Sequence, residues 1–142
     1  KILNTIEILK KLTYGEYFLS FLYYDGVPYL YIMKHENKYF MYFWVLEDID
    51  DNGKGITVFA IVELDFQDLN DILNKKYPIA HYYKTRKTYA EKTYFRVGQK
   101  ELLNVEVCEY TLNEEEWPVE DFFLDELQEL NGYIINEKMK GF

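Results

Sequence analysis

Strand-length apolar runs separated by short polar turns fill the first half of the chain. Four such runs occupy residues 17–24, 28–33, 39–48 and 56–64. Asp25-Gly26 is typical of a tight hairpin turn, and Pro28, which lacks a backbone N–H, belongs at the start of a strand or on a sheet edge. The pattern predicts a four-stranded antiparallel meander from Tyr17 to Leu64.

A helix with clear boundary signals is predicted directly after this meander. Asp65 suits the N-cap position and Asp68 the first turn, where negative charge is favourable. Residues 75 and 76 are lysines that complement the other end of the helix dipole, and Tyr77-Pro78 ends the helix. Its apolar stripe, which we expect to cover one face of the sheet, consists of Phe66, Leu69, Ile72 and Leu73.

Three further segments carry regular patterns. Residues 1–12 fit either a short helix or an initial strand. Residues 79–97 show strand-like alternation with a break near Ala90-Glu91, and residues 102–110 fit another strand. These segments add two or three strands to the predicted meander.

The acidic C-terminal part predicts a second helix. Pro118 is a good first helical residue, and the apolar pattern continues to Leu130, while residues 133–135 fit a last short strand. No repeat or flexible linker divides the chain. We therefore expect residues 1–142 to form a single α+β domain, an antiparallel sheet covered by two helices, with a main body to about residue 76 and a second layer after it as the alternative.

Composition agrees with a strand-rich domain that contains one free cysteine. Aromatic residues make up 19% of the chain, with 15 Tyr, 10 Phe and 2 Trp, and this favours strands. Cys108 is the single cysteine, so an intramolecular disulfide is excluded and a reducing cytoplasm is expected. No apolar run approaches the roughly 20 residues of a membrane-spanning helix, so no membrane contact is expected.

Charge is strongly segregated along a chain whose formal net charge is -9. Residues 75–100 carry eight cations and one anion, whereas residues 47–74 and 101–142 are acidic. Within the basic block, the stretch HYYKTRKTYAEKTYFRVGQK interleaves cations with aromatic rings. We call residues 81–100 the basic segment, and it is the candidate binding site of the chain.

One interpretation of the basic segment is contact with an external partner. Its cations would face phosphates or carboxylates while its tyrosines stack on bases or pack against a protein. The candidate binding residues are Tyr83, Lys84, Arg86, Lys87, Tyr89, Lys92, Tyr94 and Arg96. A nucleic acid would have to approach against the negative charge of the rest of the chain, whereas an acidic protein or peptide is the other external partner.

The alternative is that these cations pair inside the domain. If the basic segment lies beside residues 104–110, its Lys and Arg side chains meet Glu106 and Glu109 across the sheet. Its tyrosines then pack on neighbouring strands. Contact with nucleic acid, contact with another protein and internal pairing all stay open at this point.

The sequence contains few residues that suit catalysis or metal binding. Asp48, Asp50, Asn52 and Gly53 match the start of a calcium-binding loop, but the twelfth position, where a bidentate Glu is required, is Phe59. A polar turn is the expected structure there, with weak binding of a divalent ion as the alternative. We expect no cofactor and no metal site.

Nucleophilic catalysis lacks its usual residues as well. Ser20 is the single serine and lies inside an apolar run, while His35 and His81 are the two histidines, too few for a histidine-based zinc site. We expect Cys108 to be a small core residue. The 25 acidic residues leave an enzyme that works through paired carboxylates as a further alternative.

The span from about residue 22 to residue 76 resembles a bacterial domain family of unknown function. Members of that family have a strand, a Tyr-Asp-Gly-Pro turn, a second strand, and then a Tyr-rich strand, a Trp and an acidic loop. This chain shows YYDGVPYLYIM followed by YFMYFWVLED, with Val27 inserted between Gly26 and Pro28. The resemblance implies an α+β bacterial protein with no assigned activity, so it designates no catalytic residue.

The aromatic content suggests a function in protein binding. Twenty-seven rings exceed what a core of this size buries comfortably, and tyrosine is enriched at protein interfaces. We therefore predict a non-enzymatic cytoplasmic interaction module that binds a protein partner, or a second copy of itself, through a tyrosine-rich, charge-segregated surface. Immunity proteins and nuclease inhibitors are similarly small and acidic, and a nucleic-acid-binding module is the alternative.

Overall fold

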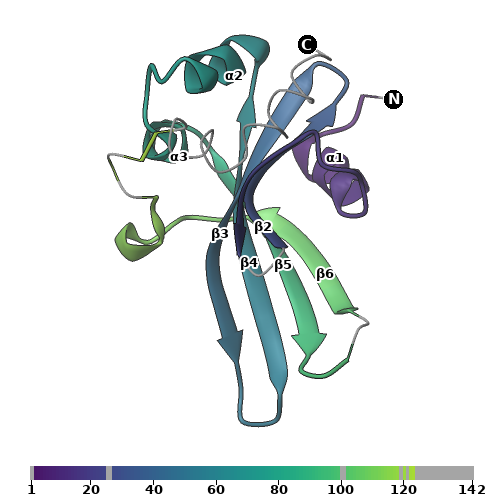
Figure 1. The fold of residues 1–142 in the computed structure, drawn as a ribbon. Coiled ribbons are helices and arrows are strands. Elements are labelled where there is room, and N and C mark those ends of the chain that lie inside the picture. Colours follow the sequence, from purple (N-terminus) through teal and green to yellow (C-terminus); the bar gives the residue numbers. More distant parts are fainter. Residues whose placement is uncertain (1, 25–26, 100–101, 119, 121, 124–142) are drawn as a thin grey trace.

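A six-stranded antiparallel sheet organises the part of the chain that the computed structural model describes, which is residues 2–24, 27–99, 102–118, 120 and 122–123 (Figure 1). The strand order follows the sequence from β1 to β6. The strands are β1 (Leu19–Tyr24), β2 (Val27–His35), β3 (Lys38–Ile49), β4 (Lys54–Leu64), β5 (Thr88–Arg96) and β6 (Leu102–Glu109). The predicted α+β fold and the meander of the first four strands are confirmed, whereas the Asp25-Gly26 turn lies outside the described residues.

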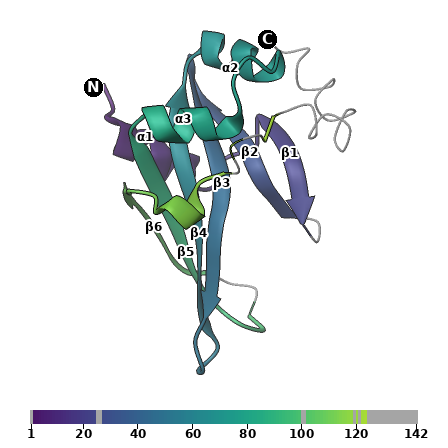
Figure 2. The same ribbon diagram turned by 90° about the vertical axis from the view of Figure 1, so that its left-hand side faces the viewer.

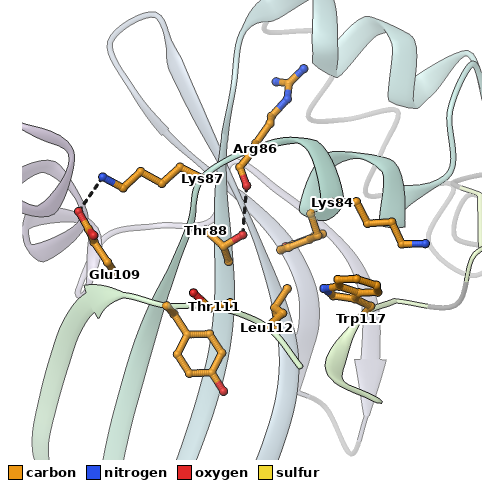
Figure 3. A pocket seen from close by; sticks show the side chains of 10 residues that line it. Lys84, Arg86, Lys87, Thr88, Glu109, Thr111, Leu112 and Trp117 are labelled. Carbon is orange, nitrogen blue, oxygen red and sulfur yellow. Dashed lines mark hydrogen bonds and ion pairs between the residues drawn. The ribbon is translucent and has the colours of Figure 1, made fainter. Parts of the chain in front are cut away.

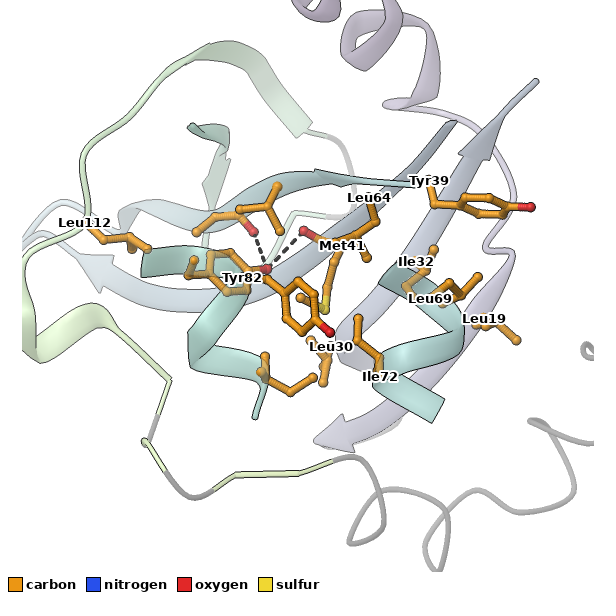
Figure 4. Packing of buried hydrophobic residues seen from close by; sticks show 14 residues of the cluster. Leu19, Leu30, Ile32, Tyr39, Met41, Leu64, Leu69, Ile72, Tyr82 and Leu112 are labelled. Carbon is orange, nitrogen blue, oxygen red and sulfur yellow. Dashed lines mark hydrogen bonds between the residues drawn. The ribbon is translucent and has the colours of Figure 1, made fainter. Parts of the chain in front are cut away.

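Helices cover both faces of the sheet (Figure 2). Helix α1 (Thr5–Leu12) lies on one face, and α2 (Phe66–Leu73) and α3 (Ile79–Thr85) lie on the other. Successive side chains of β3 point to opposite faces of the sheet, so this strand contributes to the hydrophobic cluster on each face. Met41 packs on the side of α2 and α3, and Tyr42 packs on the side of α1. Figure 4 shows Met41 with Leu64 and Leu69 in the first of these clusters.

Two helices begin at capping boxes. The Asn4 and Glu7 side chains each accept a hydrogen bond from the other residue's backbone N–H, which starts α1 and selects helix over strand for this segment. Asp65, the predicted N-cap, and Asp68, predicted in the first turn, make the same reciprocal pair at α2. Helix α2 ends at Leu73, shortly before Lys75, whose φ of 59° is left-handed.

The strand predicted over residues 79–97 is wrong in its first part. Residues 79–85 form α3, since Ile79, Ala80, Tyr82 and Tyr83 recur at helical spacing and are all buried. Strand β5 then runs from Thr88 to Arg96 without the predicted break. The basic segment is therefore part helix and part strand.

The chain leaves the sheet after β6 and crosses toward α3. This connecting segment contains a short 3₁₀ helix, η1 (Glu114–Glu116). The helix predicted from Pro118 does not begin there, because residues 118, 122 and 123 are not helical and the Phe122 carbonyl accepts a 2.9 Å hydrogen bond from the Ile79 N–H. The rest of that helix and the strand predicted at residues 133–135 lie outside the described residues.

Candidate functional site

A hollow of about 410 Å³ lies between the end of α3, the start of β5 and the segment that follows β6 (Figure 3). We call it the Trp117 hollow. Four of the eight candidate binding residues contribute to its lining, which is Tyr83, Lys84, Arg86, Lys87, Thr88, Glu109, Tyr110, Thr111, Leu112 and Trp117. The other four lie farther along β5.

Local hydrogen bonds place the rings of this hollow. The Tyr110 N–H donates to the Thr88 carbonyl at 3.0 Å, which extends the β5–β6 pairing by one residue before the chain turns away. The Tyr110 hydroxyl then donates to Glu116 Oε2 at 2.7 Å, tying its ring to η1. Burial and this carboxylate raise the pKa of Tyr110 to about 12. The arrangement leaves Trp117 opposite α3.

Lys84 and Lys87 both have carboxylate partners from other segments. The Lys84 ammonium pairs with Glu120 and lies 5.1 Å from the centre of the Trp117 ring, a cation–π arrangement. Lys87 Nζ lies 2.6 Å from Glu109 Oε1 at the end of β6 (Figure 3). The hydrogen bond from Lys84 lowers the pKa of Glu120, and the one to Glu109 raises the pKa of Lys87.

The Arg86 guanidinium points away from the hollow toward α2 (Figure 3). It forms a two-pronged contact with Asp68, with a 2.8 Å bond from Nη2 to Oδ1 and a second bond from Nη1 to Oδ2. Burial alone would raise the pKa of Asp68, but the bonds from Arg86 and the Asp65 backbone outweigh it and lower that pKa. Arg86 therefore joins the segment before β5 to α2.

Two further described cations of the basic segment, Lys92 and Arg96, lie on β5. Lys92 stands directly opposite Glu106 on β6, and its ammonium lies 5.7 Å from the centre of the Tyr110 ring. The Tyr94 hydroxyl donates to Glu106 Oε2 at 3.4 Å. Arg96 donates to a backbone carbonyl of the β3–β4 turn. The described cations are thus distributed among different partners and do not form a free positive row.

Two of the candidate binding tyrosines belong to the core. Tyr83 is 3% exposed, and its hydroxyl lies 2.9 Å from the Met41 carbonyl oxygen and 3.0 Å from that of Ala60. Tyr89 is 8% exposed and packs in the cluster under α1. Neither ring is placed to stack on a partner, because each faces the interior. Tyr94 remains half-buried on β5.

Sequence reasoning missed the segment that supplies the wall of the hollow. Tyr110 was predicted as the last residue of a strand and Trp117 as part of a solvated acidic turn, whereas Leu112 is 8% exposed and joins the core beside α3. The available signal was the presence of three large apolar or aromatic residues within an otherwise acidic stretch. Such residues indicate a segment that packs back onto the domain.

The residues that match the start of a calcium-binding loop form a local turn. Asp50 Oδ1 accepts hydrogen bonds from the backbone N–H groups of Asn52 and Lys54, each at 2.9 Å, and Gly53 takes φ 78°, so DIDDNG builds the predicted polar turn. Across the described residues, no group of three His, Cys, Asp or Glu side chains could hold a metal ion. Cys108 is a free thiol, half-buried on β6.

Carboxylates are isolated in the pockets of the described structure. The Trp117 hollow contains Glu109, a second pocket beneath α1 contains Glu91, and a third beside Tyr89 contains Glu63. Each of these three pockets has a single acidic residue in its lining, so none of the three contains the paired carboxylates of the alternative raised by the sequence. In this part of the chain, no helix has the length and apolar character needed to cross a membrane.

The fold and the hollow define an α+β domain with a mixed aromatic and charged surface depression. Comparison of the chain with family models, with curated proteins and with solved structures found no match. The resemblance of residues 22–76 to an uncharacterised bacterial family therefore stays a prediction, and the function must be argued from the site.

Proposed function

We propose that this domain is a non-enzymatic cytoplasmic interaction module, comparable to immunity proteins or inhibitors, that binds a basic protein partner over the Trp117 hollow. The observation that carries the proposal is the composition of this depression. Its walls include Tyr110, Leu112 and Trp117, and its rim carries exposed carboxylates. The rim carboxylates are Glu109, which belongs to the lining, and Glu120, which pairs with Lys84.

Ring-lined hollows with a charged rim are typical of protein interfaces. Tryptophan, tyrosine and arginine dominate the residues whose truncation weakens complexes most, and they work best inside a depression that excludes water. Tyr94, Lys92 and Glu106 continue the same mixture of rings and charges along β5 and β6. The contact surface therefore extends beyond the hollow itself.

Internal pairing of the basic segment determines which partner is favoured. Lys84, Arg86 and Lys87 are each held by a carboxylate of the same chain, so their charge is compensated locally. The excess of acidic residues then sets the net charge of -9 and attracts a positively charged protein. Exposed ion pairs such as Lys87–Glu109 contribute little to stability, so a partner's cation can compete for these carboxylates.

Affinity capture from the native host tests the proposal with two tryptophan variants. Trp117→Ala removes the ring in the hollow. Trp44→Ala is the matched control, because Trp44 is 40% exposed and stands opposite Phe59, which packs on the α1 side of the sheet. We expect a basic protein to be retained at low salt by the wild type and by Trp44→Ala, and to be lost with Trp117→Ala.

Salt provides the second condition of this experiment. Binding steered by unlike charges weakens as ionic strength rises, so raising the salt concentration should release the captured protein. Retention that is equal in both variants, retention that does not respond to salt, or an acidic partner would contradict the proposal.

A further inference from the structure

A second, smaller pocket lies on the opposite face of the sheet, beneath the end of α1. Its volume is about 100 Å³, and its lining includes two exposed residues, Gly15 and Tyr17. The lining comprises Leu12, Thr13, Gly15, Tyr17, Tyr31, Met33, Tyr42 and Glu91. These residues include one acid, three tyrosines and no base.

The Tyr42 hydroxyl lies in the wall of this pocket without a protein partner. Tyr42 is 1% exposed, and its oxygen has no hydrogen bond within the described structure. A buried hydroxyl normally finds a partner, since it loses its bonds to water on folding. Its position in the lining of a pocket indicates that the partner is an occupant of that pocket.

Glu91 supplies a carboxyl group to the same pocket from β5. It is half-buried, and burial raises its pKa to about 7, against the opposing effect of a hydrogen bond with the Thr13 side chain. The other titratable groups that interact with it are the Tyr31 and Tyr42 hydroxyls, from β2 and β3. Its strand neighbours Phe59 and Val107 are apolar. No cation of the described chain pairs with this carboxyl group.

Aromatic rings complete the lining. Tyr31 stacks on Tyr42 with ring centroids 4.8 Å apart, and Tyr17 meets the Tyr31 ring edge-on at 4.7 Å. Aromatic faces attract cations, and the attraction is strongest where water is excluded. The pocket thus combines a carboxylate, an unpartnered hydroxyl oxygen and ring surfaces, and all three favour a small positively charged group that also donates hydrogen bonds.

We propose that this pocket binds a primary ammonium group, carried either by a small free amine or by a lysine side chain. The ammonium donates hydrogen bonds to the Glu91 carboxylate and to the Tyr42 hydroxyl oxygen, which leaves the Tyr31 and Tyr17 rings to contact its carbon atoms. An anionic occupant would face the carboxylate without a compensating base, so the lining selects against it.

The site links ammonium binding to proton release. A bound cation stabilises the ionised form of Glu91 and therefore competes with the proton for this carboxyl group. Because its pKa is about 7, the ionised fraction rises about tenfold between pH 6 and pH 8. Affinity for the ammonium group should rise by about the same factor over this range.

Methylammonium chloride is the probe for a direct test by nuclear magnetic resonance. The Thr13 and Gly15 amide signals and the Glu91 side-chain carboxyl signal are followed during titration at pH 6 and pH 8, with potassium chloride at equal ionic strength as the reference. We expect saturable shifts with methylammonium, about tenfold tighter binding at pH 8, and a fall in the pKa of Glu91 at saturation. A response equal to that of potassium would overturn the assignment.

Substitutions separate binding at this pocket from weak binding elsewhere. Glu91→Gln should abolish the response, and Tyr42→Phe should weaken it while keeping the ring packing. Glu63→Gln is the matched control, since Glu63 lies on β4 outside this pocket and pairs with Lys38. If Glu91→Gln and Tyr42→Phe both bind methylammonium like the wild type, the pocket is not the site.

A capped Gly-Lys-Gly peptide distinguishes the two sources of the ammonium group. Binding of the peptide at least as tight as that of methylammonium identifies a lysine side chain, whereas binding of methylammonium alone identifies a free amine. Absence of binding by both, with only water in the pocket, would refute the proposal. Because this pocket and the Trp117 hollow lie on opposite faces, the outcome is independent of the proposed partner.

Discussion

Arg86 shows how a cation that the sequence places in a binding surface can instead hold two elements together. Its guanidinium binds Asp68, the same residue that closes the capping box of α2. Asp68 is separated from Arg86 by 18 positions and is 9% exposed. One carboxylate thus serves both the helix start and its attachment to the segment before β5.

Arg86→Ala should therefore destabilise the fold. The substitution leaves the Asp68 carboxylate buried with fewer donors, which costs about 1 to 3 kcal/mol. Lys87→Ala, which removes an exposed partner of Glu109, should give no measurable change in urea unfolding. Since the pKa of Asp68 is lowered, this stabilisation is present above its ordinary value of 3.8 and is lost as the pH falls through the lowered pKa. Equal stability of the two variants at neutral pH would contradict this role.

Glu91 makes stability depend on pH in the direction opposite to Asp68. Burial raises its pKa from 4.5 to about 7, so the folded state binds this proton more tightly than the unfolded state does. The free energy of unfolding should then decrease as the pH rises from about 4.5 to 7, by on the order of 3 kcal/mol. Glu91→Gln removes this contribution and should be more stable than the wild type at pH 8. Urea unfolding of both proteins at pH 5 and pH 8 measures the difference, and identical pH profiles would refute it.

At the level of elements, local signals and distant contacts differ in how far they can be predicted. The Asp65–Asp68 capping box and the alternation of β1 to β4 are readable because the residues involved are close in sequence. Helix α3 was missed because residues 79–97 were interpreted as strand-like alternation, whereas the burial of Tyr82 and Tyr83 against the sheet selects a helix. The Lys84–Glu120 pair joins positions 36 apart, so only the folded chain reveals it.

Two adjacent tyrosines test how α3 is attached. The Tyr83 hydroxyl reaches strand carbonyls, while the Tyr82 hydroxyl is buried with no partner in the described structure. Tyr83→Phe should lower the free energy of unfolding by about 1 kcal/mol, and Tyr82→Phe should leave it unchanged or raise it. Urea denaturation of the two variants, whose substitutions lie at adjacent positions, measures the difference in their free energies of unfolding. A larger loss for Tyr82→Phe would show that the anchoring is assigned to the wrong residue.

On the scale of the whole molecule, charges that are segregated along the sequence are brought together by folding. The basic segment lies against β6, and its cations meet carboxylates from three other segments: Asp68 of α2, Glu109 of β6 and Glu120 after η1. The domain is left with an acidic surplus, a ring-lined hollow on one face and a small acidic pocket on the other. The sequence left the pairing of β5 with β6 open as one alternative, and the hollow depends on how residues 110–117 cross toward α3.

The most direct measurement of the central claim is the affinity of the purified captured partner for three forms of the domain. Calorimetric titration compares the wild type with Trp117→Ala and Trp44→Ala at the same low salt concentration. We predict at least about a thirtyfold loss of affinity for Trp117→Ala, since a truncated hot-spot residue costs about 2 kcal/mol or more, and little change for Trp44→Ala. An unchanged affinity of Trp117→Ala, with both variants folded, would contradict it.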